Sequence, residues 1–193
     1  MRYVAGHKDQ TRARVLKEAA KAIRAEGPHR IGVAGVMAKA GLTHGGFYAH
    51  FASKDELVVA AMAQMFGEAL ATFERVTVGK PPAVALRSYI DFYLSVRHRD
   101  AHESGCPLPS LAADLPRLDP LARERFALGL SRLIGALTNL LFAIKGGDCE
   151  PLASSVLAEM AGALSLARGV DDQRQSKMLL KHSRDLLKVR LGI

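Results

Sequence analysis

Apolar residues along the chain recur with helical spacing, and short polar or glycine-containing segments separate these stretches. Near the N-terminus, four apolar residues lie three or four positions apart: Leu16, Ala19, Ala20 and Ile23. This stripe predicts a first helix over 9–26, and Gly27 followed by Pro28 predicts its end. The same reasoning predicts further helices over 33–40, 43–51, 54–77, 83–96, 108–115, 119–144, 151–167 and 172–191.

Two segments interrupt these helical stretches in the C-terminal two thirds of the chain. Residues 78–82 read VGKPP, and residues 97–107 are polar and are expected to be irregular. The sequence shows no strand-like alternation of apolar and polar residues and no internal repeat. It therefore predicts an all-α fold of about nine helices.

Residues 33–51 have the organisation of a helix-turn-helix, in which two short helices flank a glycine-containing turn after a longer supporting helix. Gly41 permits the turn because it has no Cβ. We expect Leu42, Phe47 and Phe51 to anchor the third helix on the first two. The other face of this helix carries small or hydrogen-bonding residues, which suit close approach to a groove: Thr43, His44, Gly45, Gly46, Tyr48 and His50.

Two residues in this region have the chemistry of helix caps. Thr43 is expected to cap the third helix. Ser53 is expected to cap the fourth, with Glu56 completing a capping box. Lys54 then lies where free N–H groups and the helix dipole favour a phosphate. We divide the chain into a helix-turn-helix domain over 1–56 and a helical domain over 57–193.

Charge is concentrated in the N-terminal region. The chain has 27 Lys and Arg against 19 Asp and Glu, a net charge of +8. Residues 1–56 hold ten basic and five acidic side chains, and four of the seven histidines. This clustering favours a nucleic-acid partner, although a solvated basic face has the same composition.

The residues from Val36 to Leu57, VMAKAGLTHGGFYAHFASKDEL, resemble the DNA-binding signature of the TetR family of repressors. The resemblance covers about residues 11–62, and it implies that the third helix enters the major groove. Thr43, His44 and Gly45 would then lie at the groove, Tyr48 and His50 at phosphates, and Lys54 at the phosphate backbone. The chain departs from the family at Gly32, where a Ser or Thr commonly caps the second helix. We expect Arg30 to supply the phosphate contact instead.

The same resemblance implies that the C-terminal helices bind a small-molecule effector and form a homodimer. A set of mostly apolar and aromatic residues could line an effector cavity: Phe66, Leu70, Phe73, Tyr89, Phe92, Tyr93, Cys106, Phe126 and Met160. Such stripes are also typical of an ordinary hydrophobic core. For dimerisation we predict the last two helices, which offer small residues such as Gly162 for close approach and leucines such as Leu186 for apolar area.

Cys106 lies just before a predicted helix, with Arg97, Arg99 and two histidines nearby in the sequence. A helix N-terminus and cations lower the pKa of a thiol and raise its reactivity. The segment also resembles one in a branch of the family whose members sense electrophiles or oxidants through a cysteine. The alternative is a small buried hydrophobic residue. His98, His102 and Cys106 are spaced as metal ligands on one helix face, but Gly105 and Pro107 oppose a continuous helix, so we expect no metal and no cofactor.

The sequence thus predicts a repressor that binds a palindromic operator in double-stranded DNA and is released by a small-molecule or thiol-reactive effector. An enzyme is a rival interpretation, but the sequence contains no phosphate loop, nucleophile elbow or HExxH motif. A non-specific DNA-packaging protein and a transcriptional activator are two further alternatives. We expect a cytoplasmic protein without a membrane partner, because no signal peptide is evident and no apolar run approaches about 20 residues.

Overall fold

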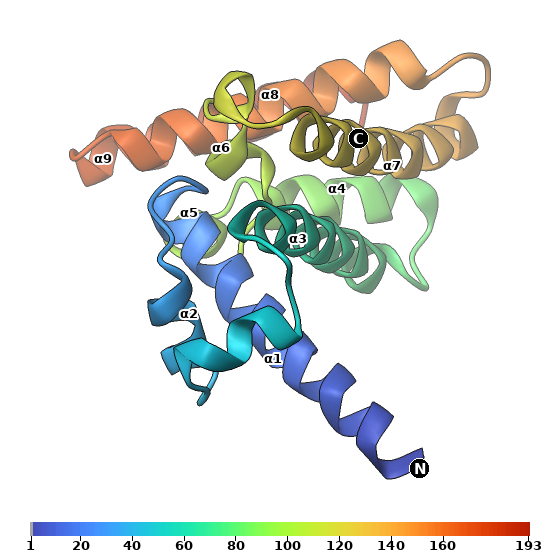
Figure 1. Ribbon diagram of the computed structural model, residues 1–193. Helices are drawn as coiled ribbons and strands as arrows, with labels where there is room; N and C mark the ends of the chain where they lie inside the picture. The colour runs from blue at the N-terminus through green and yellow to red at the C-terminus, as the bar shows by residue number, and fades with distance from the viewer. Residues whose placement is uncertain (1) are drawn as a thin grey trace.

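The computed structural model describes the backbone of residues 2–193 and the side chains from residue 8 onward. Within this part of the chain there are nine α-helices, two short 3-10 helices and no strand (Figure 1). The α-helices are α1 (Arg2–Glu26), α2 (Val33–Lys39), α3 (Lys54–Thr77), α4 (Pro82–Tyr93), α5 (Val96–Asp100), α6 (Leu108–Leu111), α7 (Pro120–Lys145), α8 (Glu150–Gly169) and α9 (Gln173–Leu191). The 3-10 helices are η1 (His44–Ala49) and η2 (Leu115–Arg117). The predicted all-α fold is confirmed.

Several helix ends follow from local chemistry. Gly27 adopts a φ of 84° directly after α1, a conformation that residues with a Cβ rarely adopt. The Ser53 hydroxyl accepts a hydrogen bond from the Glu56 N–H at 3.1 Å, as predicted. The Glu56 carboxylate accepts from the N–H of Ala52, one residue before the cap. Together these bonds fix where α3 begins.

The structure differs from the sequence prediction in several places. Helix α1 begins at Arg2 instead of residue 9, and α4 ends at Tyr93 instead of residue 96. The third helix, predicted over 43–51, is the 3-10 helix η1, and the side chain of Thr43 makes no capping hydrogen bond. The segment 97–107, expected to be irregular, begins within α5, which Ser95 caps. The helix predicted over 108–115 is divided into α6 and η2. The elements η1, α5, α6 and η2 are short, and packing rather than propensity determines such elements.

The N-terminal unit consists of α1, α2 and η1, which lie together at one end of the molecule (Figure 1). Phe47 and Phe51 are buried, and their rings stack at a centroid distance of 5.6 Å. Met37 of α2 and Ile23 of α1 are fully buried in the same core. The predicted anchoring of the third helix by Phe47 and Phe51 therefore agrees with the packing.

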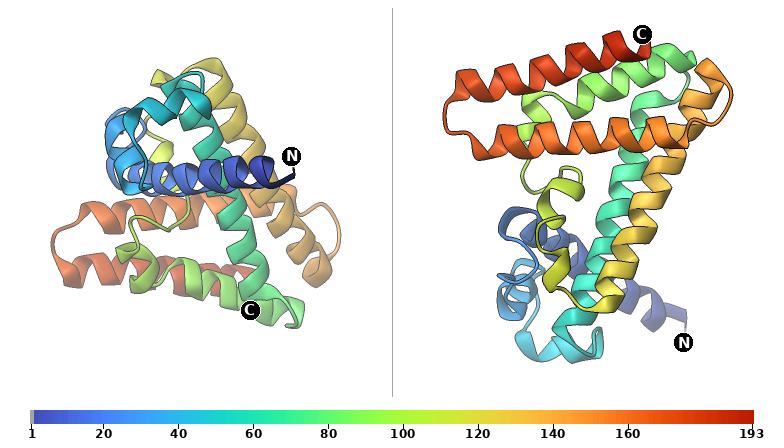
Figure 2. Two further views of the ribbon diagram at one scale, coloured as in Figure 1. Left: turned by 60° about the horizontal axis from the view of Figure 1, so that its bottom comes forward. Right: turned by 90° about the horizontal axis from the view of Figure 1, so that it is seen from above.

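The remaining helices form a second packed unit. The long helices α3 and α7 run alongside each other, and α8 and α9 lie side by side in a layer next to them (Figure 2). Helix α3 also packs against α1, and α6 packs against α1. The boundary predicted between residues 56 and 57 falls within the first turn of α3, so this helix is shared by the two units.

Helices α3 and α7 are also long and apolar enough to span a membrane by length and composition alone. Core helices of soluble proteins meet the same criterion, and α3 contributes eight buried residues to the core. The helix α7 has fewer of its apolar residues buried, because Leu121, Leu128 and Phe142 are exposed on its outer face.

Candidate functional site

The outer face of η1 carries no packing against the rest of the molecule. Tyr48 is 72% exposed, and its ring meets the edge of Phe47 at 5.2 Å. Thr43, His44 and Gly45 are exposed beside it. A Cβ on Gly45 would meet nothing within 4 Å, whereas a Cβ on Gly46 would lie 3.6 Å from the Met37 side chain of α2. The outer face of η1 therefore carries small and polar side chains and one projecting aromatic side chain, that of Tyr48.

Basic and polar groups surround this face. Arg30 is exposed before α2, and Gly32 occupies the N-cap of that helix without any side-chain cap. Lys54 is half-buried, and its amine donates to the carbonyl of His29 at 3.0 Å, which fixes it at the start of α3. His50 is half-buried, and its Nδ1 is enclosed without a hydrogen-bond partner among the described residues.

Six of the seven predicted DNA-contacting residues belong to the N-terminal unit, and Lys54 is the first residue of the shared helix α3: Arg30, Thr43, His44, Gly45, Tyr48, His50 and Lys54. Five are exposed, and His50 and Lys54 are half-buried. Their contact with DNA remains a prediction. The arrangement supplies what a groove-binding element needs, namely an exposed short helix with hydrogen-bonding side chains and adjacent cations.

A second feature is a small, partly open cavity of about 20 Å³ around the buried Cys106. Four of the predicted effector residues line it: Tyr89, Phe92, Tyr93 and Cys106. Sequence reasoning did not include Ala69, Thr72, His98, Ser104 and Gly105, which complete the lining. The cavity has room for about one water molecule, so it does not accommodate a drug-sized effector in this conformation.

The other five predicted effector residues do not line this cavity. Phe66 packs edge-to-face on Phe126 with a centroid distance of 5.4 Å, and Phe73 packs on Tyr89 at 4.7 Å. Met160 is fully buried, and Leu70 is half-buried against the core. In this conformation these residues have the packing of an ordinary hydrophobic core, which was the alternative interpretation of the sequence.

His98 holds Cys106 in place. Its Nδ1 donates to the carbonyl of Tyr93 at 2.8 Å, and its Nε2 accepts from the backbone N–H of Cys106 at 3.0 Å. A carbonyl can only accept and an N–H can only donate, so these partners require the neutral ring with the proton on Nδ1. Burial of the ring lowers the pKa of His98 to about 4. Both ring nitrogens are occupied, which leaves no lone pair for a metal.

The predicted lowering of the Cys106 pKa is wrong for this conformation. Cys106 is buried, and burial raises the pKa of its thiol because the thiolate loses its hydration. The neighbouring Tyr93 hydroxyl, and then Arg168 and Arg24, act in the opposite direction but do not outweigh burial. Tyr93 is also fully buried. The cavity therefore holds a buried hydroxyl beside a protonated thiol.

Hydrogen bonds connect the segment around this cavity to the last two helices. Arg168 of α8 donates to the carbonyls of His98 and Arg99, each at 3.0 Å. The guanidinium of Arg99 donates to the hydroxyl of Ser176 and to Gln173, both on α9, at 2.8 Å. From the other side, Arg24 of α1 donates to the carbonyl of Glu103 at 3.4 Å. The cavity segment thus contacts both the N-terminal unit and the α8–α9 layer.

Each of α8 and α9 has one exposed face that is largely uncharged, although other exposed positions of α9 carry Arg174, Lys177, Lys181 and Arg190. On α8 the exposed positions include Ser155, Ala158, Gly162, Ser165 and Leu166. On α9 the exposed positions Met178, His182, Leu186 and Val189 follow a helical spacing. An exposed face of this composition is typical of a helix-helix interface.

Comparisons with known proteins agree with this geometry. Residues 15–61 match the family described as "Bacterial regulatory proteins, tetR family". A TetR transcriptional regulator from Chloroflexus aurantiacus is 26% identical, with a TM-score of 0.82 over 100% of this chain and 97% of that one. The reduced form of E. coli NemR is 19% identical, with a TM-score of 0.81 over 93% of this chain and 95% of that one.

A TetR-family regulator from Agrobacterium tumefaciens gives a TM-score of 0.77 at 22% identity, covering 92% of this chain and 97% of that chain. No curated protein matches the sequence significantly. The match over the helix-turn-helix and the shared fold over nearly the whole chain agree with each other. Residues 15–61 therefore form a helix-turn-helix that matches the TetR family of DNA-binding regulators, and the whole chain has the fold of TetR-family transcription regulators.

Proposed function

We propose that the protein is a repressor that binds a palindromic operator as a homodimer and is released by a small-molecule or thiol-reactive effector. The observation that carries the proposal is the unpacked outer face of η1, where Tyr48 projects 72% exposed beside Thr43 and His44. An aromatic side chain this exposed on a short helix has no role in the fold of one chain. It suits contact with another surface.

DNA recognition follows from two kinds of contact. Thr43, His44 and Gly45 would approach base edges in the major groove, because their small or polar side chains leave the helix free to enter. Tyr48, His50, Lys54 and Arg30 would contact phosphates, which fix the orientation of the protein without reading sequence. The cluster of positive charge in residues 1–56 supports this division. Binding to chromosomal DNA would take place in the cytoplasm.

The homodimer would form through the exposed faces of α8 and α9. A two-fold axis there pairs the small residues of α8, such as Gly162, and the apolar residues of α9, such as Leu186, with their copies. It would also place two copies of η1 on one side of the assembly. These would read half-sites about 34 Å apart, one turn of DNA, or a multiple of that distance.

Release would depend on the cavity at Cys106. The cavity is small, so a small-molecule effector has to bind an opened conformation and shift the population toward it. A thiol-reactive effector has the same requirement, because the thiol is buried and protonated in the closed conformation. The E. coli relative is described as a reduced form, which is compatible with a thiol-dependent state in this chain as well.

The test is selection of bound sequences from random duplex DNA, with Tyr48→Ala and His44→Ala as variants. We expect the wild-type protein to enrich a palindrome and both variants to lose that enrichment. His102→Ala is a matched control, since His102 is an exposed histidine far along the chain from η1. Repression, as opposed to activation, is then measured as reduced transcription from a promoter that carries the recovered site.

The rival functions give different results in the same experiment. A non-specific packaging protein would retain DNA without enriching any sequence. An enzyme would bind no DNA at low salt, and turnover of a small molecule would be the next measurement. Absence of enrichment at low salt would therefore overturn the specific-repressor proposal.

A further inference from the structure

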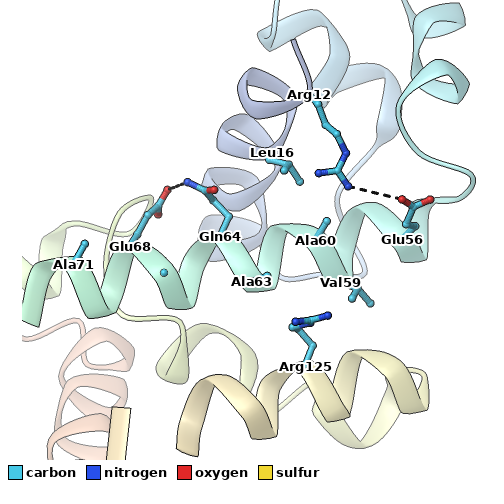
Figure 3. A pocket seen from close by; sticks show the side chains of 11 residues that line it. Arg12, Leu16, Glu56, Val59, Ala60, Ala63, Gln64, Glu68, Ala71 and Arg125 are labelled. Carbon is cyan, nitrogen blue, oxygen red and sulfur yellow. Dashed lines mark hydrogen bonds and ion pairs between the residues drawn. The ribbon is translucent and has the colours of Figure 1, made fainter. Parts of the chain in front are cut away.

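A wide groove lies along α3, between α1 of the helix-turn-helix unit and α7 of the C-terminal unit (Figure 3). Its volume is about 650 Å³, within the range of small-molecule sites and far larger than the cavity at Cys106. The floor of the groove is formed by small residues of α3: Ala60, Ala63, Gly67 and Ala71. Because these side chains are short, the surface of α3 lies low between its two neighbours.

Two arginines reach into the groove from opposite walls. Arg12 extends from α1 and Arg125 from α7, and both lie near the Val59 and Ala60 end of the floor (Figure 3). Arg125 is half-buried, and its guanidinium has no ion pair or hydrogen bond with any residue that the structure describes. Arg12 lies over the ring of Phe51 at 4.8 Å and 3.8 Å from the Glu56 carboxylate, which is a long ion pair.

The acidic groups of the groove already have partners. The Glu68 carboxylate accepts from Arg24 at 2.6 Å and from Gln64 at 2.9 Å. The Glu56 carboxylate lies 3.8 Å from Arg12 and also accepts from the backbone N–H of Ala52 at 2.6 Å. The charge that remains unpaired is therefore the positive charge of Arg125, and it lies at one end of an apolar floor.

We infer that this groove is a second ligand site, separate from the Cys106 cavity, which takes a small amphipathic monoanion. Its carboxylate would meet Arg125 and Arg12, and its apolar body would lie on Ala63, Gly67 and Ala71. The charge complementarity comes from the unpaired guanidinium, and the volume suits an aromatic or medium-chain carboxylate. A ligand here contacts both α1 and α7, so it binds only when the two units have this relative arrangement.

The test is direct titration of the full-length protein, without DNA, with 2-naphthoate and with its uncharged counterpart 2-naphthamide. We expect 2-naphthoate to bind more tightly than the amide. Arg125→Gln should weaken 2-naphthoate binding by about tenfold and remove the difference between the two probes. Arg123→Gln is the matched control, because Arg123 is exposed on the same helix and does not line the groove.

A second variant tests the floor of the groove. Gly67→Leu adds a side chain where the structure has open space, so the fold accepts it while the groove is filled. It should weaken both probes and leave the thermal unfolding temperature unchanged or higher. The inference is overturned if neither 2-naphthoate nor decanoate binds at millimolar concentration, or if Arg125→Gln and Gly67→Leu both leave binding unchanged. Because no DNA is present, these outcomes are independent of whether operator recognition holds.

Discussion

At the scale of single residues, His98 couples the fold to pH. The ring stacks on Phe92 and meets the edge of Tyr93, and both of its nitrogens are hydrogen-bonded. A protonated ring would have to donate from Nε2 toward the N–H of Cys106, which is itself a donor. The structure therefore excludes the imidazolium, and burial lowers the pKa of His98 to about 4.

The first prediction concerns the pH dependence of stability. Because the folded pKa lies below the ordinary value of 6.5, the stabilisation by His98 is complete above about pH 6.5 and is lost as the pH falls toward 4. Between about pH 7.5 and about pH 5, the wild-type protein should lose about 2 kcal/mol more free energy of unfolding than His98→Gln. Urea unfolding at the two pH values measures this difference. Equal pH dependence in the two proteins would show that His98 is not neutral and buried.

The second prediction concerns Arg24, which is the buried link between α1 and the C-terminal unit. Its guanidinium donates to Glu68 at 2.6 Å and to the carbonyls of Met65 and Glu103 at 3.4 Å. Arg24→Met should lower the free energy of unfolding by about 2–3 kcal/mol, since it leaves several acceptors without a donor. Glu68 is partly exposed, which limits the loss. As a control, Lys21→Met removes the exposed ion pair with Glu18 and should have no measurable effect.

At the scale of elements, α7 shows how two glycines in one helix have different roles. A Cβ on Gly129 would lie 2.2 Å from the Phe66 ring, so this glycine is what allows α3 and α7 to approach each other there. A Cβ on Gly135 would meet nothing within 4 Å. The close approach of α3 and α7 therefore depends on Gly129 and not on the glycine content of the helix.

The third prediction follows from this contrast. Gly129→Ala should destabilise the protein by about 1–3 kcal/mol, because Phe66 is buried and has little room to move. Gly135→Ala should stabilise it by up to about 1 kcal/mol, through higher helix propensity. Thermal or urea unfolding of the two variants gives the comparison. A similar effect of both substitutions would contradict the packing of Phe66 on Gly129.

At the scale of the whole molecule, the proposed dimer would form through the exposed faces of α8 and α9. Leu186 is 65% exposed in the middle of the apolar positions of α9, and Val189 is 77% exposed one turn later. Burying apolar surface of this kind against a second copy of the chain would stabilise a dimer. In the proposed dimer, two copies of the short 3-10 helix η1 would act together in recognition.

The fourth prediction tests this association. Leu186→Glu should shift the protein toward monomers in sedimentation experiments and weaken operator binding, because two like charges would meet near the two-fold axis. Leu121→Glu is the control, since Leu121 is 54% exposed on α7, outside the proposed interface. If Leu186→Glu remains as dimeric as the wild-type protein, the dimer uses another face.

The sequence alone was sufficient for the all-α fold, the helix-turn-helix and most helix positions. These features depend on local patterns: the helical spacing of apolar residues, the glycine after α1, and the capping residues Ser53 and Glu56. The range of α3 agrees with its prediction because both its ends carry such signals. The 3-10 geometry of η1 was not predictable, because η1 depends on packing against α2 and Thr43 supplies no capping bond.

Only the tertiary structure decided the chemistry of the C-terminal unit. The sequence places cations near Cys106, but burial outweighs them and raises the pKa of the thiol. Aromatic residues that the sequence treats alike are divided between the cavity at Cys106 and plain core packing. The groove with Arg12 and Arg125 joins residues more than a hundred positions apart. Burial, cavities and contacts between residues distant in the sequence depend on how the helices pack against one another. The periodicity of residues within one helix does not specify this packing.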